Sequence, residues 1–396
     1  MKYQFPTSFF FGTSTAAAQI ETASAHSWRG ERSKDGHIFQ ETIEHEKRRD
    51  EDAAYIQKFG TVYRCGVDWA RLQTEPFGLF DADVVAEYSV FFQKLNAQGM
   101  QIMLVLHHFT NPIWFEALGS WEKEENIAYF SNFAEQAIHH FSKYVAYWNT
   151  FNEPNVYVMN GWILGNFPPH VKNYFKANKV LKIIQKAHEI TYNVLKNKDL
   201  NKPVGISLNT ATFEAANVLG YIPAKFVHWW FNERSARHFE LCDFWGLSYY
   251  AYMLFDPMPI SQVDRPGKLA QMGIPHDNMW GYQPTGLLKI LQYFYKTYQK
   301  PIIITENGIC TESDSVRMQA IHDYLKVIQT AIEVHKIPVQ GYIHWSTFDN
   351  FEWDLGPTYR FGLVRIDLKT KNRTMTAAGD YYEQVSKTKC IEFDSK

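Results

Sequence analysis

Eight short apolar runs alternate with longer amphipathic segments along this chain, and this alternation limits its possible folds more than any other sequence feature. Each run has strand length, and each intervening segment repeats apolar residues at three- and four-residue spacing. The predicted strands cover residues 9–15, 62–69, 102–108, 145–153, 204–210, 244–250, 302–308 and 341–348. The predicted helices cover 50–59, 84–97, 126–144, 174–197, 286–298 and 316–335, with weaker patterns over 225–240 and 375–386.

This order of elements predicts an α/β fold, a parallel (β/α)8 TIM barrel with its active site at the C-terminal rim of the strands. Parallel neighbours need a crossover connection, and the crossover helices then cover the outside of the barrel. The structural alternative is a doubly wound open sheet. That fold would favour a glycine-rich phosphate turn after an early strand, but FGTSTAA has a single glycine. No linker or repeat interrupts the chain, so we expect one catalytic domain over residues 1–396.

The charge balance excludes several classes of partner. Lys and Arg number 40 against 42 Asp and Glu, so no global field favours nucleic acid or an anionic membrane. Neither a secretory signal nor a membrane-spanning run is visible, which predicts a cytoplasmic protein. Its cysteines are far apart in sequence and are expected to be reduced, and no metal or organic cofactor is expected. They are Cys65, Cys242, Cys310 and Cys390. The sequence predicts no oligomeric state.

Polar or aromatic residues stand at the ends of most predicted strands. In a barrel these ends meet at one rim, where active sites are built. The residues at or just beyond the strand ends are Gln19, Arg64, Asp68, His107, His108, Asn152, Glu153, Ser248, Tyr250, Glu306, Asn307, Trp345, Glu352 and Trp353. His107 and His108 are adjacent on a strand, so they point to opposite sides and cannot chelate one metal together.

Two of these residues are glutamates on the fourth and seventh strands, nearly across the barrel from each other. Glu153 lies in WNTFNEP and Glu306 lies in PIIITENG. A glycosidase needs one carboxyl to protonate the leaving oxygen and another to meet the oxocarbenium ion, at about 5 to 5.5 Å in retaining enzymes. Arg64 beside one glutamate is expected to keep it ionised, whereas the other, flanked by aromatic residues and Asn152, would have a raised pKa and hold its proton.

Each residue also has a simpler structural interpretation. A single glutamate at a strand end is more often a solvated rim carboxylate or half of an ion pair. Trp345, Trp353 and Phe361, taken singly, are more readily explained as core residues. The hypothesis of an active site therefore depends on the pair of glutamates within N-E-P and T-E-N-G on the expected strands.

Together the motifs resemble the β-glycosidases of glycoside hydrolase family 1. The resemblance runs from residue 5 to about residue 385. It implies a (β/α)8 barrel and a retaining β-glycosidase, which agrees with the interpretation of the periodicity and the carboxylates. The motifs that carry it, in chain order, are FPTSFFFGTSTAAAQIE, YRCGVDWARL, LHHFTNPIWF, TFNEPNV, ITENGI and HWSTFDNFEWDLG.

The resemblance implies roles for individual residues. Glu153 is similar in position to the general acid/base, and Glu306 to the nucleophile. Arg64 and Asn152 would steady them, with Asn152 also binding the sugar 2-hydroxyl and Tyr250 donating to the nucleophile. The positions that hold or stack the non-reducing-end sugar are matched by Gln19, His108, Trp345, Glu352 and Trp353, and Phe361 matches a pocket aromatic.

The chain departs from the family pattern at three points. Ser248 stands in GLSYY where the family usually has Asn, and a shorter donor there would weaken contact with the leaving-sugar side or the acid/base. Thr22 replaces a glycine after QIE. The chain is also shorter than is typical, which predicts shorter rim loops and a more open aglycone site.

The leading hypothesis is a retaining exo-β-glycosidase for neutral β-glycosides, first β-glucosides and then β-galactosides or β-fucosides. Glu352 disfavours a 6-phosphorylated sugar, because a carboxylate there would repel the phosphate. One alternative is a sugar-binding pseudoenzyme, supported only by Ser248, since both glutamates are present. The other is a transglycosylase, in which an acceptor hydroxyl replaces water and the same residues serve.

Overall fold

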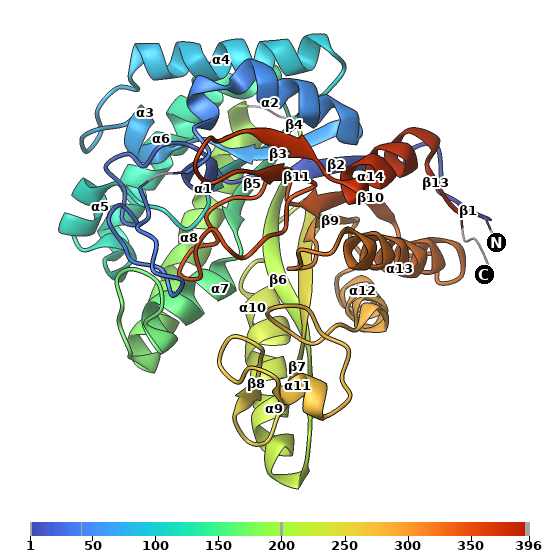
Figure 1. Ribbon diagram of the computed structural model, residues 1–396. Helices are drawn as coiled ribbons and strands as arrows, with labels where there is room; N and C mark the ends of the chain where they lie inside the picture. The colour runs from blue at the N-terminus through green and yellow to red at the C-terminus, as the bar shows by residue number, and fades with distance from the viewer. Residues whose placement is uncertain (1, 41, 199–200, 393–396) are drawn as a thin grey trace.

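Eight parallel strands close into a barrel at the centre of the molecule (Figure 1). This computed structural model describes residues 2–40, 42–198 and 201–392. The strands pair around the ring in chain order, and pairing of the last with the first closes the barrel. They are β2 (Phe10–Ser14), β3 (Val62–Gly66), β4 (Gln101–His107), β5 (Val145–Asn152), β6 (Val204–Ala215), β7 (Phe244–Phe255), β9 (Ile302–Asn307) and β10 (Val339–Trp345). The predicted fold class and all eight predicted strands are confirmed.

Long helices cover the outside of the barrel, as the sequence predicted (Figure 1). Their buried faces carry the apolar residues at three- and four-residue spacing that the periodicity indicated. The long helices are α2 (Arg49–Ile56), α4 (Ala82–Ala97), α6 (Ile127–Phe141), α8 (Tyr174–Lys198), α12 (Pro284–Tyr298), α13 (Asp314–Glu333) and α14 (Ala377–Thr388). Shorter helices in the loops are α1 (Ala17–Ile20), α3 (Trp69–Leu72), α5 (Ile113–Ala117), α7 (Pro154–Val158), α9 (Tyr221–His228), α10 (Ser235–Arg237) and α11 (Lys268–Gln271).

A layer of apolar side chains fills the barrel below the rim. It is built by Phe10, Val62, Met103, Phe244, Ile303 and Ile343, with Tyr147 packed against them. Glycines allow the large rings to fit, since a Cβ on Gly341 would lie 2.2 Å from the Phe10 ring. Because this layer fills the interior, a substrate can enter only from the rim at the carboxyl ends of the strands.

Two strands are much longer than the sequence indicated. β6 and β7 were expected to end at residues 210 and 250, but they continue to Ala215 and Phe255. Beyond the barrel they continue to pair with each other, from Thr212 opposite Tyr252 to Ala215 opposite Phe255. The expected helix over 225–240 also begins earlier, as α9, and continues through a wide turn into α10. The extended ribbon and α9 form an arm at the lower end of Figure 1.

Small sheets complete the described part of the chain. β1 (Lys2–Gln4) pairs with β13 (Cys390–Glu392), and β11 (Val364–Ile366) pairs with β12 (Arg373–Met375). β8 (Pro259–Ile260) pairs with the end of β7 in the arm. All four cysteines are buried free thiols, as predicted. Among the helices of the described residues, none is long and apolar enough to cross a membrane. The single domain remains a prediction.

Candidate active site

Glu306 lies at the end of β9 in a buried, positively charged setting. Its Oε1 accepts from Arg64 Nη1 at 2.5 Å, and its Oε2 accepts from the Tyr250 hydroxyl at 2.9 Å. Arg64 comes from β3 and is fully buried beneath the rim. Its Nη1 also donates to Ser14 at 3.0 Å and its Nη2 to Ser207 at 3.2 Å. The Arg64 guanidinium is therefore held in place by two serine hydroxyls as well as by the Glu306 carboxylate.

Glu153 follows β5 directly and has a different environment. Its backbone has a φ of 41°, in the left-handed region, at the start of α7, where Pro154 follows. Asn209 Nδ2 of β6 donates to Glu153 Oε1 at 3.0 Å. Ser248, paired with Asn209 across β6 and β7, lies close enough to lower the pKa of Glu153 without forming a hydrogen bond of regular geometry. Both immediate donors to Glu153 are thus neutral.

The two carboxyl groups are electrostatically unequal. Burial, followed by the charge of Glu306, raises the pKa of Glu153 to about 8, against the lowering effects of Ser248, Asn209 and Arg64. Burial also raises the pKa of Glu306, against the lowering effect of Arg64 and Tyr250. The sequence predicted the effect of Arg64 but not this desolvation. Because Arg64 contacts Glu306 directly, Glu306 ionises first and Glu153 holds the proton.

Arg64 also links the glutamates to a third group. Its Nη2 donates to Asn152 Oδ1 at 2.6 Å, and Asn152 Nδ2 lies 2.9 Å from His108 Nε2. Burial, followed by the charge of Arg64, lowers the pKa of His108 well below its usual value, so its ring is neutral. Because His108 Nε2 accepts from the Asn152 amide, the proton of the neutral ring lies on Nδ1. His108 Nδ1 has no hydrogen-bond partner among the described residues. The His108 ring thus offers one free donor.

A second group of residues lies beside the first and combines Gln19 of α1 with residues of the loop after β10. Gln19 Nε2 donates to Asn350 Oδ1 at 3.0 Å and to the Phe351 carbonyl at 2.8 Å. Burial raises the pKa of Glu352 to about 8, and its charge interaction with Glu306 acts in the same direction, whereas Trp345 and Gln19 oppose this. Among the described residues, Gln19 Oε1 and Glu352 Oε2 have no hydrogen-bond partner. These buried polar atoms can bind hydroxyl groups of a ligand.

Aromatic rings surround these polar groups. The His108 ring centroid lies 5.9 Å from those of both Trp345 and Trp353. The Tyr250 ring lies 5.9 Å from Phe361, edge to face. Rings bordering polar donors and acceptors are typical of sites that bind sugars, whose C–H faces stack on aromatic side chains. The structure therefore brings together all twelve candidate residues that the sequence named, including Phe361.

Three strand-end residues lie elsewhere. Asp68 accepts from the backbone amides of Ala70 and Arg71, at the start of α3. His107 binds Asn111 at 3.0 Å, on the outer side of the barrel wall. Asn307 donates to the Tyr249 carbonyl. All three stabilise the surroundings of the rim instead of lining the site. No group of three His, Cys, Asp or Glu side chains in the described chain is placed to hold a metal ion.

Sequence reasoning missed three polar residues that contact the candidate site. Asn209 binds Glu153, and Ser14 and Ser207 bind Arg64. Asn209 ends the fifth predicted strand, in SLNT, so the criterion that selected the other rim residues would have found it. The serines give no comparable signal, because a short hydroxyl side chain inside a strand is common in many sheets.

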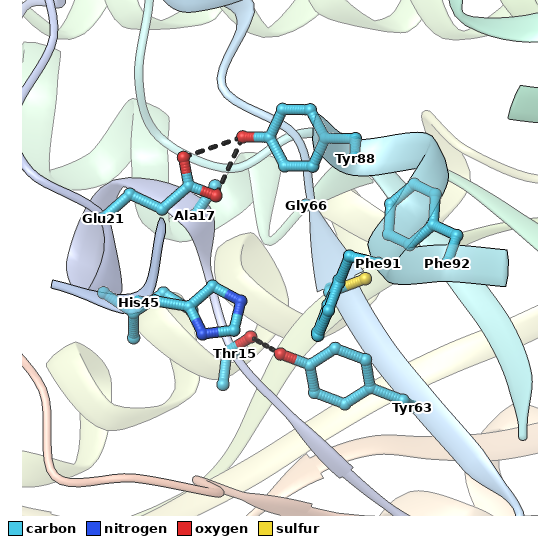
Figure 2. A pocket seen from close by; sticks show the side chains of 11 residues that line it. Thr15, Ala17, Glu21, His45, Tyr63, Gly66, Tyr88, Phe91 and Phe92 are labelled. Carbon is cyan, nitrogen blue, oxygen red and sulfur yellow. Dashed lines mark hydrogen bonds between the residues drawn. The ribbon is translucent and has the colours of Figure 1, made fainter. Parts of the chain in front are cut away.

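A separate small cavity lies behind the barrel wall, between α1, β3 and α4 (Figure 2). Its volume is about 10 Å³, room for about one water molecule, so it cannot take a sugar. Figure 2 shows Glu21 held by the Tyr88 hydroxyl, at 2.9 and 2.8 Å, on one side of this cavity. Arg71 adds a 2.6 Å ion pair to Glu21. Glu21 follows Gln19 by two residues, so this anchor positions the segment that carries Gln19.

Comparisons with known proteins decide the family. The model of glycosyl hydrolase family 1 matches residues 1–218 and 231–391. The chain belongs to glycosyl hydrolase family 1. Among curated relatives, β-glucosidase A of Thermotoga maritima is 27% identical over 448 residues, covering 98% of this chain and 99% of the relative. A galactolipid galactosyltransferase from Arabidopsis thaliana chloroplasts is 29% identical over 332 residues, covering 78% of this chain and 51% of that protein.

Solved structures agree with this assignment. A β-glycosidase from Pyrococcus horikoshii has a TM-score of 0.87 and 28% identity, covering 100% of this chain and 97% of that one. The chain spans about half the length of the chloroplastic plant relatives that it matches. This family 1 member is a glycoside hydrolase, and its substrate is a carbohydrate.

Proposed function

We propose that this family 1 enzyme is a retaining exo-β-glycosidase that hydrolyses neutral β-glycosides, foremost β-glucosides. The observation that carries the proposal is the inequality of its two buried carboxyl groups. Glu306 contacts a guanidinium and a tyrosine hydroxyl, whereas Glu153, whose pKa is raised to about 8, contacts neutral donors. One carboxylate and one carboxylic acid are what a two-step displacement needs.

In the first step, the Glu306 carboxylate attacks the anomeric carbon as the bond to the aglycone oxygen breaks. Glu153 gives its proton to that oxygen, so a neutral alcohol leaves. Forming the glycosyl ester neutralises Glu306, which removes one cause of the raised pKa of Glu153. In the second step, Glu153 takes a proton from water as the water oxygen attacks the anomeric carbon and releases Glu306.

Other residues are proposed to hold the sugar. Asn152, oriented by Arg64 and His108, is placed to bind the 2-hydroxyl. Gln19 and Glu352 are assigned to the hydroxyls at the far side of the ring, and Trp345 with Trp353 to its C–H face. In either protonation state Glu352 supplies no positive charge for a phosphate, so a neutral sugar is favoured over a 6-phosphorylated one.

The test is the initial rate on nitrophenyl glycosides: β-glucoside, β-galactoside, β-fucoside, β-mannoside, β-glucoside 6-phosphate and α-glucoside. We expect turnover of the neutral β-glycosides, lost by about a thousand-fold or more in Glu306→Ala. The first-formed sugar should be the β-anomer by NMR. Faster turnover of the 6-phosphate would contradict the neutral-sugar assignment. No turnover of any glycoside by the folded protein would instead favour the sugar-binding pseudoenzyme.

The acid role of Glu153 has its own test. In Glu153→Ala, kcat/KM should fall by about a hundred-fold or more for alkyl β-glucosides, whose leaving groups need protonation. For aryl glucosides with activated leaving groups, kcat/KM should fall far less, because these groups need little protonation in the first step. Equal losses on both substrate types would contradict the role.

A second candidate activity is transglycosylation. The relative named as a galactolipid galactosyltransferase favours it, since a family member of similar identity transfers a sugar to an acceptor. The same two glutamates would serve, with an acceptor hydroxyl replacing water in the second step. Product analysis with added alcohols separates the two activities: glycosylated alcohol as the main product would indicate a transferase, and free sugar a hydrolase.

A further inference from the structure

Helix α9 carries a face of large apolar side chains that nothing in the described chain covers. Exposed residues recur at helical spacing along α9 and into the turn that follows it, with Ile222 76% exposed, Phe226 51% and Trp229, just after α9, 40%. The turn before the helix adds Val218 and Leu219, both highly exposed. Single exposed apolar residues are ordinary, but a contiguous group of this kind marks an interaction site. We call these five residues the α9 face.

The charges around the α9 face are unusual. Residues 215–232 contain no Asp or Glu, and Lys225 is their only Lys or Arg. Lys225 stacks over the Tyr221 ring, with its Nζ 4.7 Å from the ring centroid. Apolar and aromatic side chains with a lysine on one amphipathic helix are typical of segments that lie in a lipid–water interface. An anionic surface would attract Lys225. The carboxylates that flank this segment are held by other residues, because the Tyr252 hydroxyl donates to Glu214 and His228 lies 3.6 Å from Glu233.

The α9 face lies at the end of the arm formed by the extensions of β6 and β7 (Figure 1). The turn before α9 is packed tightly on the strand end, since a Cβ on Gly220 would lie 1.7 Å from the Phe255 carbonyl. The arm leaves the barrel at its carboxyl rim, beyond Asn209, which contacts Glu153. All of α9 also falls outside the segments matched by the family model, which stop at residue 218 and resume at 231.

A half-buried apolar surface connects the arm to the candidate active site. Its core is Ala211, Trp230, Phe231 and Ala251, and packed against it are Val156, Met159, Ile163, Phe213, Val227, Met253 and Trp280. One end lies near the candidate active site, because Trp280 lies 6.0 Å from the Tyr250 ring and Val156 belongs to α7, which begins directly after Glu153. The other end lies at Val227, next to Phe226 of the α9 face. We call this set the arm cluster.

We propose that the α9 face docks on a lipid surface, and that the arm cluster receives the apolar aglycone of a β-glycoside held in that surface. This inference rests on the proposed function, because it assigns the leaving-group side of the same site. From Asn209 to Ala215 the arm extends about 20 Å beyond the acid/base, at roughly 3.3 Å for each residue. The sugar would then reach Glu306 while its tail stays in contact with apolar side chains.

A lipid surface fits the α9 face better than a second copy of the chain. A stable dimer buries about 800 Å² on each partner, usually across a broad and complementary patch. The α9 face is a short helix and one turn at the end of a protruding arm, which offers a convex edge (Figure 1). Insertion of such an edge into the headgroup region needs no complementary partner surface.

The docking is tested by co-sedimentation with phosphatidylcholine vesicles containing phosphatidylglycerol. We expect the wild-type protein to bind, and Ile222→Ser/Phe226→Ser to bind about ten-fold or more weakly. Leu79→Ser/Val90→Ser is the matched control, since these residues, 88% and 67% exposed, lie on and before α4, away from the arm. It should bind like the wild type. Equal binding by all three proteins, or by none, would overturn the proposal.

The aglycone assignment is tested with alkyl β-glucosides of increasing chain length, below their micellar concentrations. In the wild type and the matched control, kcat/KM should rise with chain length, and Met253→Ser should flatten this rise. Ile222→Ser/Phe226→Ser and the matched control should keep wild-type kcat/KM on nitrophenyl β-glucoside, and Met253→Ser should lower kcat/KM for the longest alkyl chain more than for this short aglycone. A rise that Met253→Ser leaves unchanged would overturn the assignment.

The outcomes separate this proposal from the proposed function. Vesicle binding without turnover of any glycoside would contradict the function and leave the docking supported. Turnover of glycosides without vesicle binding would support the function and contradict the docking. Light scattering without vesicles tests whether a second copy of the chain covers the α9 face instead. A dimer that dissociates in Ile222→Ser/Phe226→Ser would show this, and would overturn the lipid assignment.

Discussion

At the scale of single residues, identical side chains acquire different properties from their neighbours. Both glutamates are buried, and burial alone would raise the pKa of each. Glu306 is compensated by direct contact with Arg64 and Tyr250, whereas Glu153 receives only the neutral amide of Asn209 and the nearby Ser248 hydroxyl. Ser248 is neutral, so it adds no charge beside Glu153. The two carboxyl groups therefore remain in unequal electrostatic environments.

This coupling predicts the effect of removing one charge. In Glu306→Gln, the pKa of Glu153 should fall from about 8, because the carboxylate that disfavoured its ionised form is gone. Burial remains, so the pKa should stay above its ordinary value of 4.5. Titration of the side-chain carboxyl carbons by NMR in 13C-glutamate-labelled protein measures this, with Glu153→Gln to assign the resonance. An unchanged pKa would contradict the coupling.

At the scale of elements, strands and short helices place these residues. Asn152 and Glu153 end β5, Glu306 lies at the end of β9, and the register of β6 and β7 sets Asn209 opposite Ser248. The loops that carry further site residues depend on local anchors. Asp68 is one of them, because it begins α3 and accepts from Ser24 Oγ at 2.7 Å.

The anchor at Asp68 predicts a loss of stability without loss of chemistry. Asp68→Ala leaves the Ala70 and Arg71 amides without their acceptor, which should lower the free energy of unfolding by about 1 to 2 kcal/mol. Asp68→Asn keeps an acceptor and should lose less. Urea unfolding and kcat/KM on nitrophenyl β-glucoside measure both effects. A large fall in kcat/KM at unchanged stability would place Asp68 in the active site after all.

At the scale of the whole molecule, function depends on contacts between distant parts of the chain. Gln19 and Asn350 are 331 positions apart and bind each other at 3.0 Å. Closing the barrel brings them together and also excludes water from Glu352, whose pKa burial raises to about 8. Such a buried carboxyl is costly to ionise, so the sugar site should reduce the stability of the fold at alkaline pH.

Glu352→Gln should reveal this cost as a pH-dependent gain in stability. The folded pKa of Glu352 is raised from 4.5 to about 8, so its favourable contribution is full below 4.5 and is lost as pH rises through 8. The glutamine does not titrate. The variant's free energy of unfolding, relative to wild type, should therefore increase from acidic to mildly alkaline pH, by a few kcal/mol at most. Urea unfolding across this range measures it; a constant difference would contradict the buried, protonated state.

The sequence by itself determined the architecture and most of the candidate site. Apolar periodicity gave the eight strands and their order, because burial imposes a repeat that is visible in the residues. The motifs around Glu153 and Glu306 gave the family, which the matching family model confirmed.

Only the tertiary structure decided which polar strand ends face the site. Asp68 and His107 stand at comparable positions in the sequence, yet they bind the loop and the outer wall, because the side that a residue faces depends on strand register and local turns. Desolvation of Glu306 and the uncovered α9 face have the same origin. Both depend on which segments pack together and which surfaces they leave open, and no local pattern of residues encodes that.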